Sequence, residues 1–273
     1  MLFWFLLLFA VLQGLLEWLP VSSEGQSVTL LVSFLHVGSQ EAISLSLWLH
    51  LGTLIAVVLK YYKELFFFID FRDRSPEVVQ WRWFILLTTF GTAITGIPCY
   101  LLLSYLGESS VFGEYITLII GIALLVTAFI LYFSRKIEKK GVPIAELSKK
   151  RMLVVGLLQG FTIIPGISRS GTTVGGLLFL GVGKEEALKG SFIMSIPAVL
   201  GGFTLNLSWS LITHEPVLLF KWWEITLAIL VTAIVGFLTI ELLLRVAKKY
   251  SFAFVCLVLG LIIILFFLLG ILL

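Results

Sequence analysis

The sequence predicts an all-α, polytopic membrane protein built as an inverted-topology repeat. Each half is expected to hold one re-entrant helix-turn-helix hairpin and three transmembrane helices. The first observation behind this fold class is composition: 59% of the residues are hydrophobic, 13% are charged, and the mean hydropathy is +1.10. Because soluble domains carry about 25% charged residues, we expect a single integral membrane domain over residues 1–273.

The second observation is the length of the apolar runs. Crossing a hydrocarbon core of about 30 Å takes about 20 helical residues. Six runs meet this requirement and are predicted as spans, at residues 43–59, 83–105, 115–133, 191–213, 224–244 and 252–273. The first segment is not expected to be a removable signal peptide, because it lacks a basic start and carries Gln13 and Glu17. Cys99 and Cys256 lie in apolar runs without zinc-type spacing, so we expect packing roles for them.

Two further apolar segments are interrupted by turn-forming residues. Residues 1–35 are broken at Pro20-Val-Ser-Ser-Glu-Gly, and residues 152–183 are broken at Pro165-Gly-Ile-Ser-Arg-Ser-Gly. Irregular backbone at membrane depth is tolerated only where it is buried in protein or lines a water-filled cavity. Both segments are therefore predicted as re-entrant hairpins.

The third observation is an internal repeat. At a constant offset of 146, without a gap, Gln13 aligns with Gln159, Ser22 with Ser168, and Gly25 with Gly171. Repeat 1 covers about residues 1–145 and repeat 2 about residues 146–273. Each hairpin precedes three spans, an odd number, so the second half must enter the membrane from the opposite face. In this architecture the broken segments meet near the midplane, where their helix N-termini favour an anion.

Basic residues predict the orientation. All but two of the 19 lysines and arginines lie in the loops within residues 60–82, 135–151, 184–189 and 245–249. The exceptions are Lys221 and Arg169. This asymmetry places the basic loops in the cytoplasm, so both termini and the loops near Gly107 and His214 are expected to face outward.

An arginine inside an apolar hairpin is the leading functional candidate. Insertion of a charge such as Arg169 costs about 2.5 to 3.5 kcal/mol, so an intramembrane charge implies a function. Its guanidinium suits a phosphate or a carboxylate; the alternative is a structural salt bridge to Glu17. Hydroxyls around it resemble an oxyanion cradle, although such groups also hydrogen-bond between membrane helices. They belong to Ser168, Ser170, Thr172 and Thr173, beside Gly171.

The first hairpin supplies a carboxylate and two serines. Glu17 follows Gln13 by four residues, so both project from one helix face. General base, metal ligand and counter-ion of Arg169 all remain open for Glu17. Ser22 or Ser23 is a candidate nucleophile, with helix N-capping as the alternative. Glu24 is expected to lie nearer to water.

These motifs resemble a known family. Gln13-Gly-Leu-Leu-Glu17, followed by Leu19-Pro-Val-Ser-Ser23, and Pro165-Gly-Ile-Ser-Arg-Ser-Gly-Thr-Thr173 are similar to the two signatures of the undecaprenyl-diphosphate phosphatases of the bacitracin-resistance (BacA/UppP) type. The resemblance covers essentially the whole chain. It implies hydrolysis of a C55-type polyprenyl diphosphate to the monophosphate carrier lipid, which is recycled for cell-envelope glycan synthesis. It also implies a multi-pass cell-membrane protein whose active site opens to the outer face.

By matching position, the resemblance gives functional roles to Glu17, Ser23, Ser168, Arg169 and Thr173, with Gln13 in the Glu/Gln position of the motif. The remaining predicted site residues come from the two broken segments themselves and from His50 as a candidate replacement for the family histidine. Glu17, Ser23, Arg169 and His50 are the predicted catalytic residues, and Glu17 is also the predicted ligand of a divalent cation, Mg²⁺ or Ca²⁺, implied by the family. Predicted substrate-binding residues are Gln13, Ser22, Gln26, Ser168, Ser170, Gly171, Thr172 and Thr173. The expected partners are the lipid diphosphate, the bilayer and a second copy of the chain in a homodimer. Bacitracin is expected to compete by sequestering the lipid, and no nucleic acid is expected.

One position departs from the family pattern. Many members have histidine where this chain has Gln26, and glutamine can be neither nucleophile nor base. Three interpretations follow: Ser23 acts with Glu17 as base, His50 substitutes, or the protein no longer hydrolyses. The alternative to a catalytic role is a neutral His50 that donates one hydrogen bond between helices. At the level of function, a polyprenyl-phosphate transporter or flippase of the same fold is the alternative to a phosphatase, and an inactive paralogue with a structural role is the third.

Overall fold

The computed structural model describes residues 2–70, 72–107, 110–137, 141–213, 220–249 and 252–272. These residues form helices joined by short turns and contain no strand, apart from a single bridge between Val142 and Val182. The helices are α1 (Leu2–Leu16), α2 (Ser23–Leu35), α3 (Ser39–Lys60), α4 (Tyr62–Ile69), α5 (Pro76–Gly107), α6 (Ser110–Ile137), α7 (Lys149–Gly160), α8 (Arg169–Phe179), α9 (Lys184–Thr213), α10 (Trp222–Lys249) and α11 (Phe252–Leu272). Single 3₁₀ turns, η1 (Ile144–Glu146) and η2 (Phe161–Ile163), flank α7.

Six of the described helices are long and apolar enough to cross a membrane: α3, α5, α6, α9, α10 and α11. This confirms the six predicted spans and a multi-pass membrane protein. α5 and α9 each begin about two turns earlier than predicted. α5 begins at Pro76, since proline is pre-organised for the first helical position. The first turn of α9 carries Glu185 and Glu186, and such acidic residues are favourable near a helix N-terminus.

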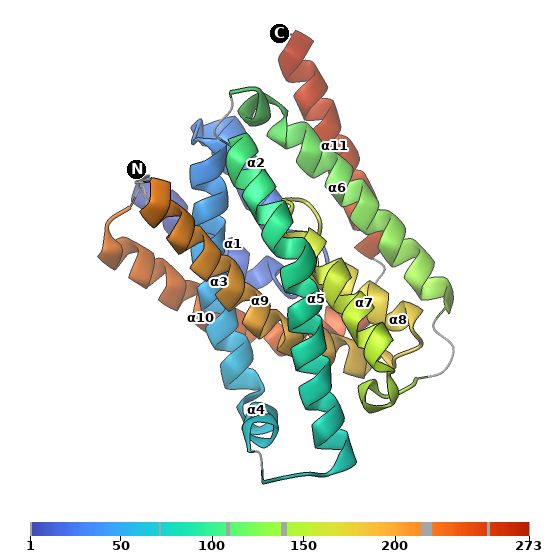
Figure 1. Cartoon of the computed structure of the whole chain (residues 1–273). Coiled ribbons are helices and arrows are strands. Elements are labelled where there is room, and N and C mark those ends of the chain that lie inside the picture. Colours follow the sequence, from blue (N-terminus) through green and yellow to red (C-terminus); the bar gives the residue numbers. More distant parts are fainter. Residues whose placement is uncertain are drawn as a thin grey trace.

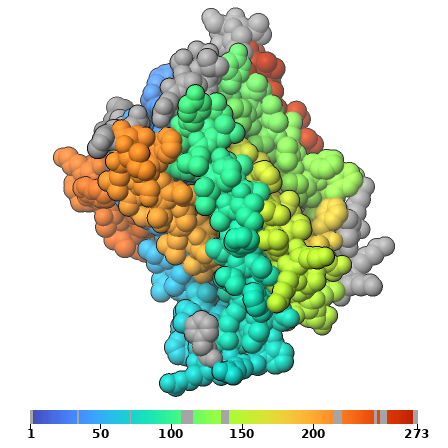
Figure 2. All heavy atoms as spheres, in the orientation of Figure 1, coloured from blue at the N-terminus to red at the C-terminus, as the bar shows by residue number. Residues whose placement is uncertain are grey.

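The surface of the spanning helices is apolar. Phe90 of α5 is 59% exposed, and Phe254 and Leu265 of α11 are 69% and 57% exposed. Figure 1 shows α6 and α11 side by side, and Figure 2 shows α5 crossing the visible face between α9 and α7. Apolar surface of this extent fits contact with lipid tails rather than with water.

The segment after α3, predicted only as a basic loop, contains the short helix α4. α4 buries Phe68, whose ring stacks on Trp81 with the ring centroids 5.3 Å apart, and leaves Phe66 and Phe67 exposed. Arg82 donates from Nε to the Phe68 carbonyl oxygen at 2.9 Å. The predicted outer loop at His214, like Lys139 and Lys140, lies outside the described residues.

Besides α4, four of the described helices are too short to span. α1 and α2 have 15 and 13 residues, and α7 and α8 have 12 and 11, against the roughly 20 that a span requires. The chain turns between the members of each pair at Pro20 and at Pro165–Gly166. α1 packs against α10, and α7 packs against α5.

Small residues bring α7 close to α5. A Cβ atom added to Gly156 would lie 2.3 Å from the Thr88 carbonyl oxygen. Thr92 and Thr95 of α5 donate hydrogen bonds to the carbonyl oxygens of Gly156 and Leu157, at 3.2 and 2.8 Å. This close contact fixes the start of the second broken segment.

Candidate active site

The first turn is shaped by a serine cap. Ser22 adopts a left-handed conformation with φ of 58° and caps α2, its Oγ accepting the Gly25 N–H at 3.2 Å. A Cβ atom on Gly25 would lie 2.9 Å from the Gly166 Cα. The turns of the two broken segments therefore touch, backbone to backbone, at two glycines.

The second turn has the same cap. Ser168 caps α8, and its Oγ accepts the Gly171 N–H at 3.1 Å. Its own N–H donates to Thr127 Oγ1 of α6 at 3.0 Å. The capping alternative considered for Ser22 is thus confirmed, and Ser168 has the equivalent role in the other half.

Glu17 is the centre of the site. Its Oε1 accepts a hydrogen bond from Arg169 Nη2, so the carboxylate of the first turn pairs with the guanidinium of the second. Its Oε2 accepts hydrogen bonds from Gln13 Nε2 and Ser23 Oγ, each at 2.8 Å. The side chains of Glu17 and Arg169 are only 5% and 18% exposed. The ion pair considered from sequence is confirmed, within a cluster that contains a hydroxyl nucleophile candidate.

His50 reaches the same carboxylate from α3. Its Nδ1 lies 2.7 Å from the Ser46 carbonyl oxygen, and its Nε2 lies 3.3 Å from Glu17 Oε2. Because a carbonyl oxygen can only accept, Nδ1 carries a proton and Nε2 is the atom presented to the site. The imidazole therefore belongs to the cluster.

The other hydroxyls divide into two groups. Ser170 Oγ donates to the Leu19 carbonyl oxygen at 3.2 Å and lies 3.3 Å from Ser168 Oγ, which ties the two turns together. Thr173 Oγ1 donates to the Arg169 carbonyl oxygen at 2.8 Å and lies 2.6 Å from Ser191 Oγ. Thr172 Oγ1 is buried without a hydrogen-bond partner.

A small polar cavity of about 20 Å³ collects seven of the predicted residues. They are Glu17, Ser22, Ser23, His50, Ser168, Arg169 and Ser170. Five predicted residues do not line it: Gln13, Gln26, Gly171, Thr172 and Thr173. Gln26, which stands where the family often has histidine, donates from Nε2 to the Val21 carbonyl oxygen at 2.8 Å. That bond assigns Gln26 to the turn.

An apolar cavity of about 470 Å³ adjoins this cluster. Glu24, His50 and Arg169 line both cavities, and the walls of the larger one come mainly from α5, α7 and α9. Gly201 on α9 has open space where a Cβ atom would be. The sequence did not predict this cavity, nor the positions of Thr162 and Glu24 in the polar cavity. These features depend on the packing of helices that are distant in sequence.

No group of three histidine, cysteine or acidic side chains that could hold a metal ion occurs among the residues that the structure describes. The two cysteines are free, and Cys256 donates to the Pro20 carbonyl oxygen at 3.0 Å beside the first turn. This agrees with the packing role expected for Cys256.

Comparisons with known proteins identify the family of the chain. A family model described as "Bacitracin resistance protein BacA" matches residues 6–262. The chain belongs to this family.

Proteins named "Undecaprenyl-diphosphatase" are similar to it over nearly their whole length. The one from Methanothrix thermoacetophila is 36% identical over 256 residues, 94% of this chain and 93% of that protein. The one from Methanopyrus kandleri is 37% identical over 261 residues, with the same two shares. The one from Halothermothrix orenii is 33% identical over 257 residues, 93% of this chain and 94% of that protein.

Proposed function

We propose that this protein hydrolyses a polyprenyl diphosphate of the undecaprenyl class to the monophosphate carrier lipid and inorganic phosphate. Membership of the family and the names of its relatives support the activity. The observation that carries the proposal is the pairing of Glu17 with Arg169 beside an apolar cavity of about 470 Å³. A charged site next to an apolar cavity matches a substrate with a charged head and a hydrocarbon chain.

In this proposal the two parts of the substrate bind in the two cavities. The isoprenoid chain occupies the space between α5 and α9, and the diphosphate faces Arg169 and His50. α2 and α8 begin at the capped turns, so their free N–H groups and positive dipole ends favour phosphate. Catalysis of phosphoryl transfer consists mainly of such positioning and charge stabilisation.

The proposed nucleophile is Ser23, because its Oγ already donates to Glu17 Oε2 and a hydroxyl needs an adjacent base. Oγ forms a bond to the terminal phosphorus while the bridging P–O bond breaks, and the lipid monophosphate leaves. The hydroxyl proton passes to Glu17 Oε2, which His50 Nε2 also faces. Water then attacks the phosphoserine and the bond from phosphorus to Ser23 Oγ breaks. Glu17 returns its proton to the departing Oγ, while His50 Nε2 takes the proton of the water and passes it to the released inorganic phosphate.

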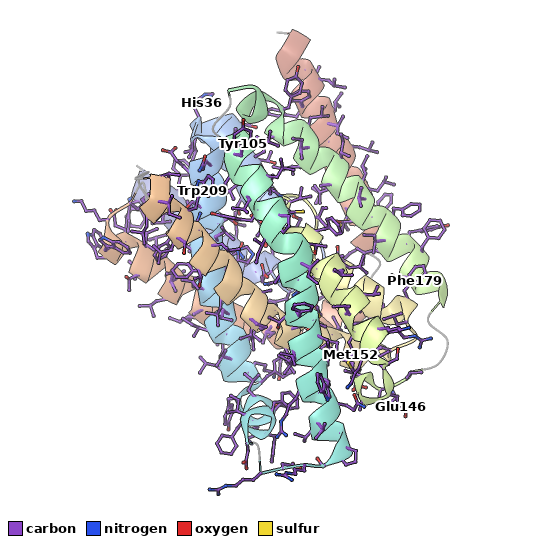
Figure 3. The ribbon with its side chains drawn as sticks, in the orientation of Figure 1. His36, Tyr105, Glu146, Met152, Phe179 and Trp209 are labelled. Atoms are coloured by element: carbon purple, nitrogen blue, oxygen red, sulfur yellow. The ribbon has the colours of Figure 1, made fainter. Side chains whose placement is uncertain are left out.

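The architecture proposed here is the inverted repeat with two re-entrant hairpins. Its support is the offset of 146, which relates the two capping serines, Ser22 and Ser168, and the odd number of spans in each half. The site is proposed to open to the outer face, with the basic loops in the cytoplasm. Figure 3 shows Glu146 and Met152, which flank the basic first turn of α7, toward the opposite end from His36 and Tyr105. Bacitracin would compete for the lipid diphosphate, and a homodimer is the proposed assembly.

The test is phosphate release from undecaprenyl diphosphate by the purified protein, with and without Mg²⁺ or Ca²⁺, beside Glu17→Gln, Ser23→Ala and His50→Ala. Release by the wild type that fails in Glu17→Gln supports the phosphatase, and failure in Ser23→Ala supports the nucleophile. A polyprenyl-phosphate carrier is the second candidate, favoured by the two-half architecture. Tight lipid binding without release of phosphate would favour that carrier.

A further inference from the structure

Glu24 occupies the junction of the cavities. It lies in the first turn of α2, directly after Ser23. It lines the polar cavity with Glu17 and Arg169, and it also lines the apolar cavity of about 470 Å³. It further borders a third small cavity that contains Tyr100 and Asn206. The sequence suggested a place nearer to water, yet its Oε1 is buried.

The two carboxylates of the site differ in how far their oxygens are already hydrogen-bonded. Glu17 receives four polar contacts, from Arg169 on Oε1 and from Gln13, Ser23 and His50 on Oε2. Glu24 Oε1 has no hydrogen-bond partner at all. A carboxylate oxygen without a hydrogen-bond partner is therefore available at Glu24, while both oxygens of Glu17 already have polar partners.

A diphosphate entering this site meets too little positive charge. The charge of Arg169 is already opposed by Glu17, so a second carboxylate at Glu24 would repel the incoming anion. A buried charge without compensation costs several kcal/mol. Mg²⁺ is commonly bound by one or two carboxylates together with substrate phosphates, and not by an all-protein cage. A divalent cation would thus compensate the diphosphate and Glu24 at once.

We propose that Glu24 is the protein ligand of a divalent cation that enters together with the diphosphate. This inference rests on the proposed function and assigns the cation to Glu24, leaving Glu17 as counter-ion of Arg169 and acceptor for Ser23. When bound, the cation supplies charge neutralisation at the headgroup.

The test measures cation binding apart from turnover. Purified protein is loaded with a polyprenyl methylenediphosphonate, which cannot be hydrolysed between its phosphorus atoms, and Mn²⁺ binding is followed by electron paramagnetic resonance. We expect one Mn²⁺ per chain only when the analogue is present. Glu24→Gln should weaken Mn²⁺ binding more than about tenfold, or about 1.4 kcal/mol, and Glu24→Asp should retain part of the affinity. Glu41→Gln is the matched control, because Glu41 caps α3 through the Gly38 N–H and lines none of the three cavities.

Each outcome decides a separate point. Unchanged Mn²⁺ affinity in Glu24→Gln, or no Mn²⁺ binding by wild type with the analogue bound, overturns the cation site. Unchanged Mn²⁺ affinity in Glu24→Gln together with reduced turnover would instead assign Glu24 a proton-donating role. Analogue binding is measured separately, so a protein that does not bind it refutes the lipid-diphosphate function itself and the cation site with it. Thermal unfolding of both Glu24 variants shows whether a loss reflects misfolding.

Discussion

Removing one partner of the Glu17–Arg169 pair should lower the stability of the protein more than the loss of an ordinary hydrogen bond would. The two side chains are 5% and 18% exposed, so either charge left alone would be buried without compensation. Loss of one partner of a buried pair costs about 3–5 kcal/mol. We therefore expect Glu17→Gln and Arg169→Met each to lower the free energy of unfolding by about that amount.

The double variant gives the sharper result. Simple addition of the two losses would give about 6–10 kcal/mol. With both charges removed, no uncompensated charge remains, so the loss should fall short of the sum by about 2–3 kcal/mol, within the range of measured coupling energies. Reversible unfolding in mixed detergent micelles, followed by tryptophan fluorescence, measures all four proteins.

An exposed ion pair provides the control. Glu241 is 62% exposed at the side chain and pairs with Lys60 between α10 and α3. The same cycle with Glu241→Gln and Lys60→Met should yield a coupling energy below about 1 kcal/mol. If the losses at Glu17 and Arg169 add to within about 0.5 kcal/mol, the two turns are not joined by these charges and the reasoning fails.

Three further predictions follow from single contacts. His50→Gln should lower turnover by about 10²–10⁴-fold while lipid binding persists, because proton transfer by a positioned side chain contributes that much; unchanged turnover in the phosphate assay would contradict it. Gly156→Ala should destabilise the protein by about 1–3 kcal/mol or more, because its Cβ atom would meet backbone of α5. Gly201→Ala, in open space, should leave stability unchanged or raise it by up to about 1 kcal/mol, and equal losses at the two glycines would refute this. Ser168→Ala should cost about 1 kcal/mol by loss of the α8 cap, whereas Ser148→Ala, at a cap without a side-chain bond, should stay within about 0.5 kcal/mol. Thermal unfolding of both serine variants tests the difference, and an equal effect would contradict it.

Much of the fold and half of the site could be predicted from composition and turn chemistry. A run of about 20 apolar residues can satisfy its backbone in lipid only as a helix, which is why the six spans were correct. Pro165, Gly166 and Ser168 are incompatible with a continuous helix, which predicted the second turn. A lone intramembrane arginine needs a partner, and this requirement led to Glu17.

The remainder depends on contacts that leave no local pattern. Thr127 receives the Ser168 N–H across 41 positions of sequence, and a threonine in an apolar span has many other uses. The position of Glu24 depends on the rotation of α2 against α3, which its flanking residues do not reveal. The extra turns of α5 and α9 were missed because apolar length marks the membrane-embedded part of a helix, and the polar turns beyond it follow capping rules.

We propose that the two broken segments of the chain together form a single diphosphatase site. The most direct test is the initial rate of inorganic phosphate release from undecaprenyl diphosphate by wild type and by Arg169→Ala, both verified as folded by size-exclusion chromatography. We expect multiple turnovers from the wild type and less than about 1% of that rate from Arg169→Ala, equivalent to about 2.7 kcal/mol or more of lost transition-state stabilisation. Comparable rates from the two proteins would contradict the assignment of the site.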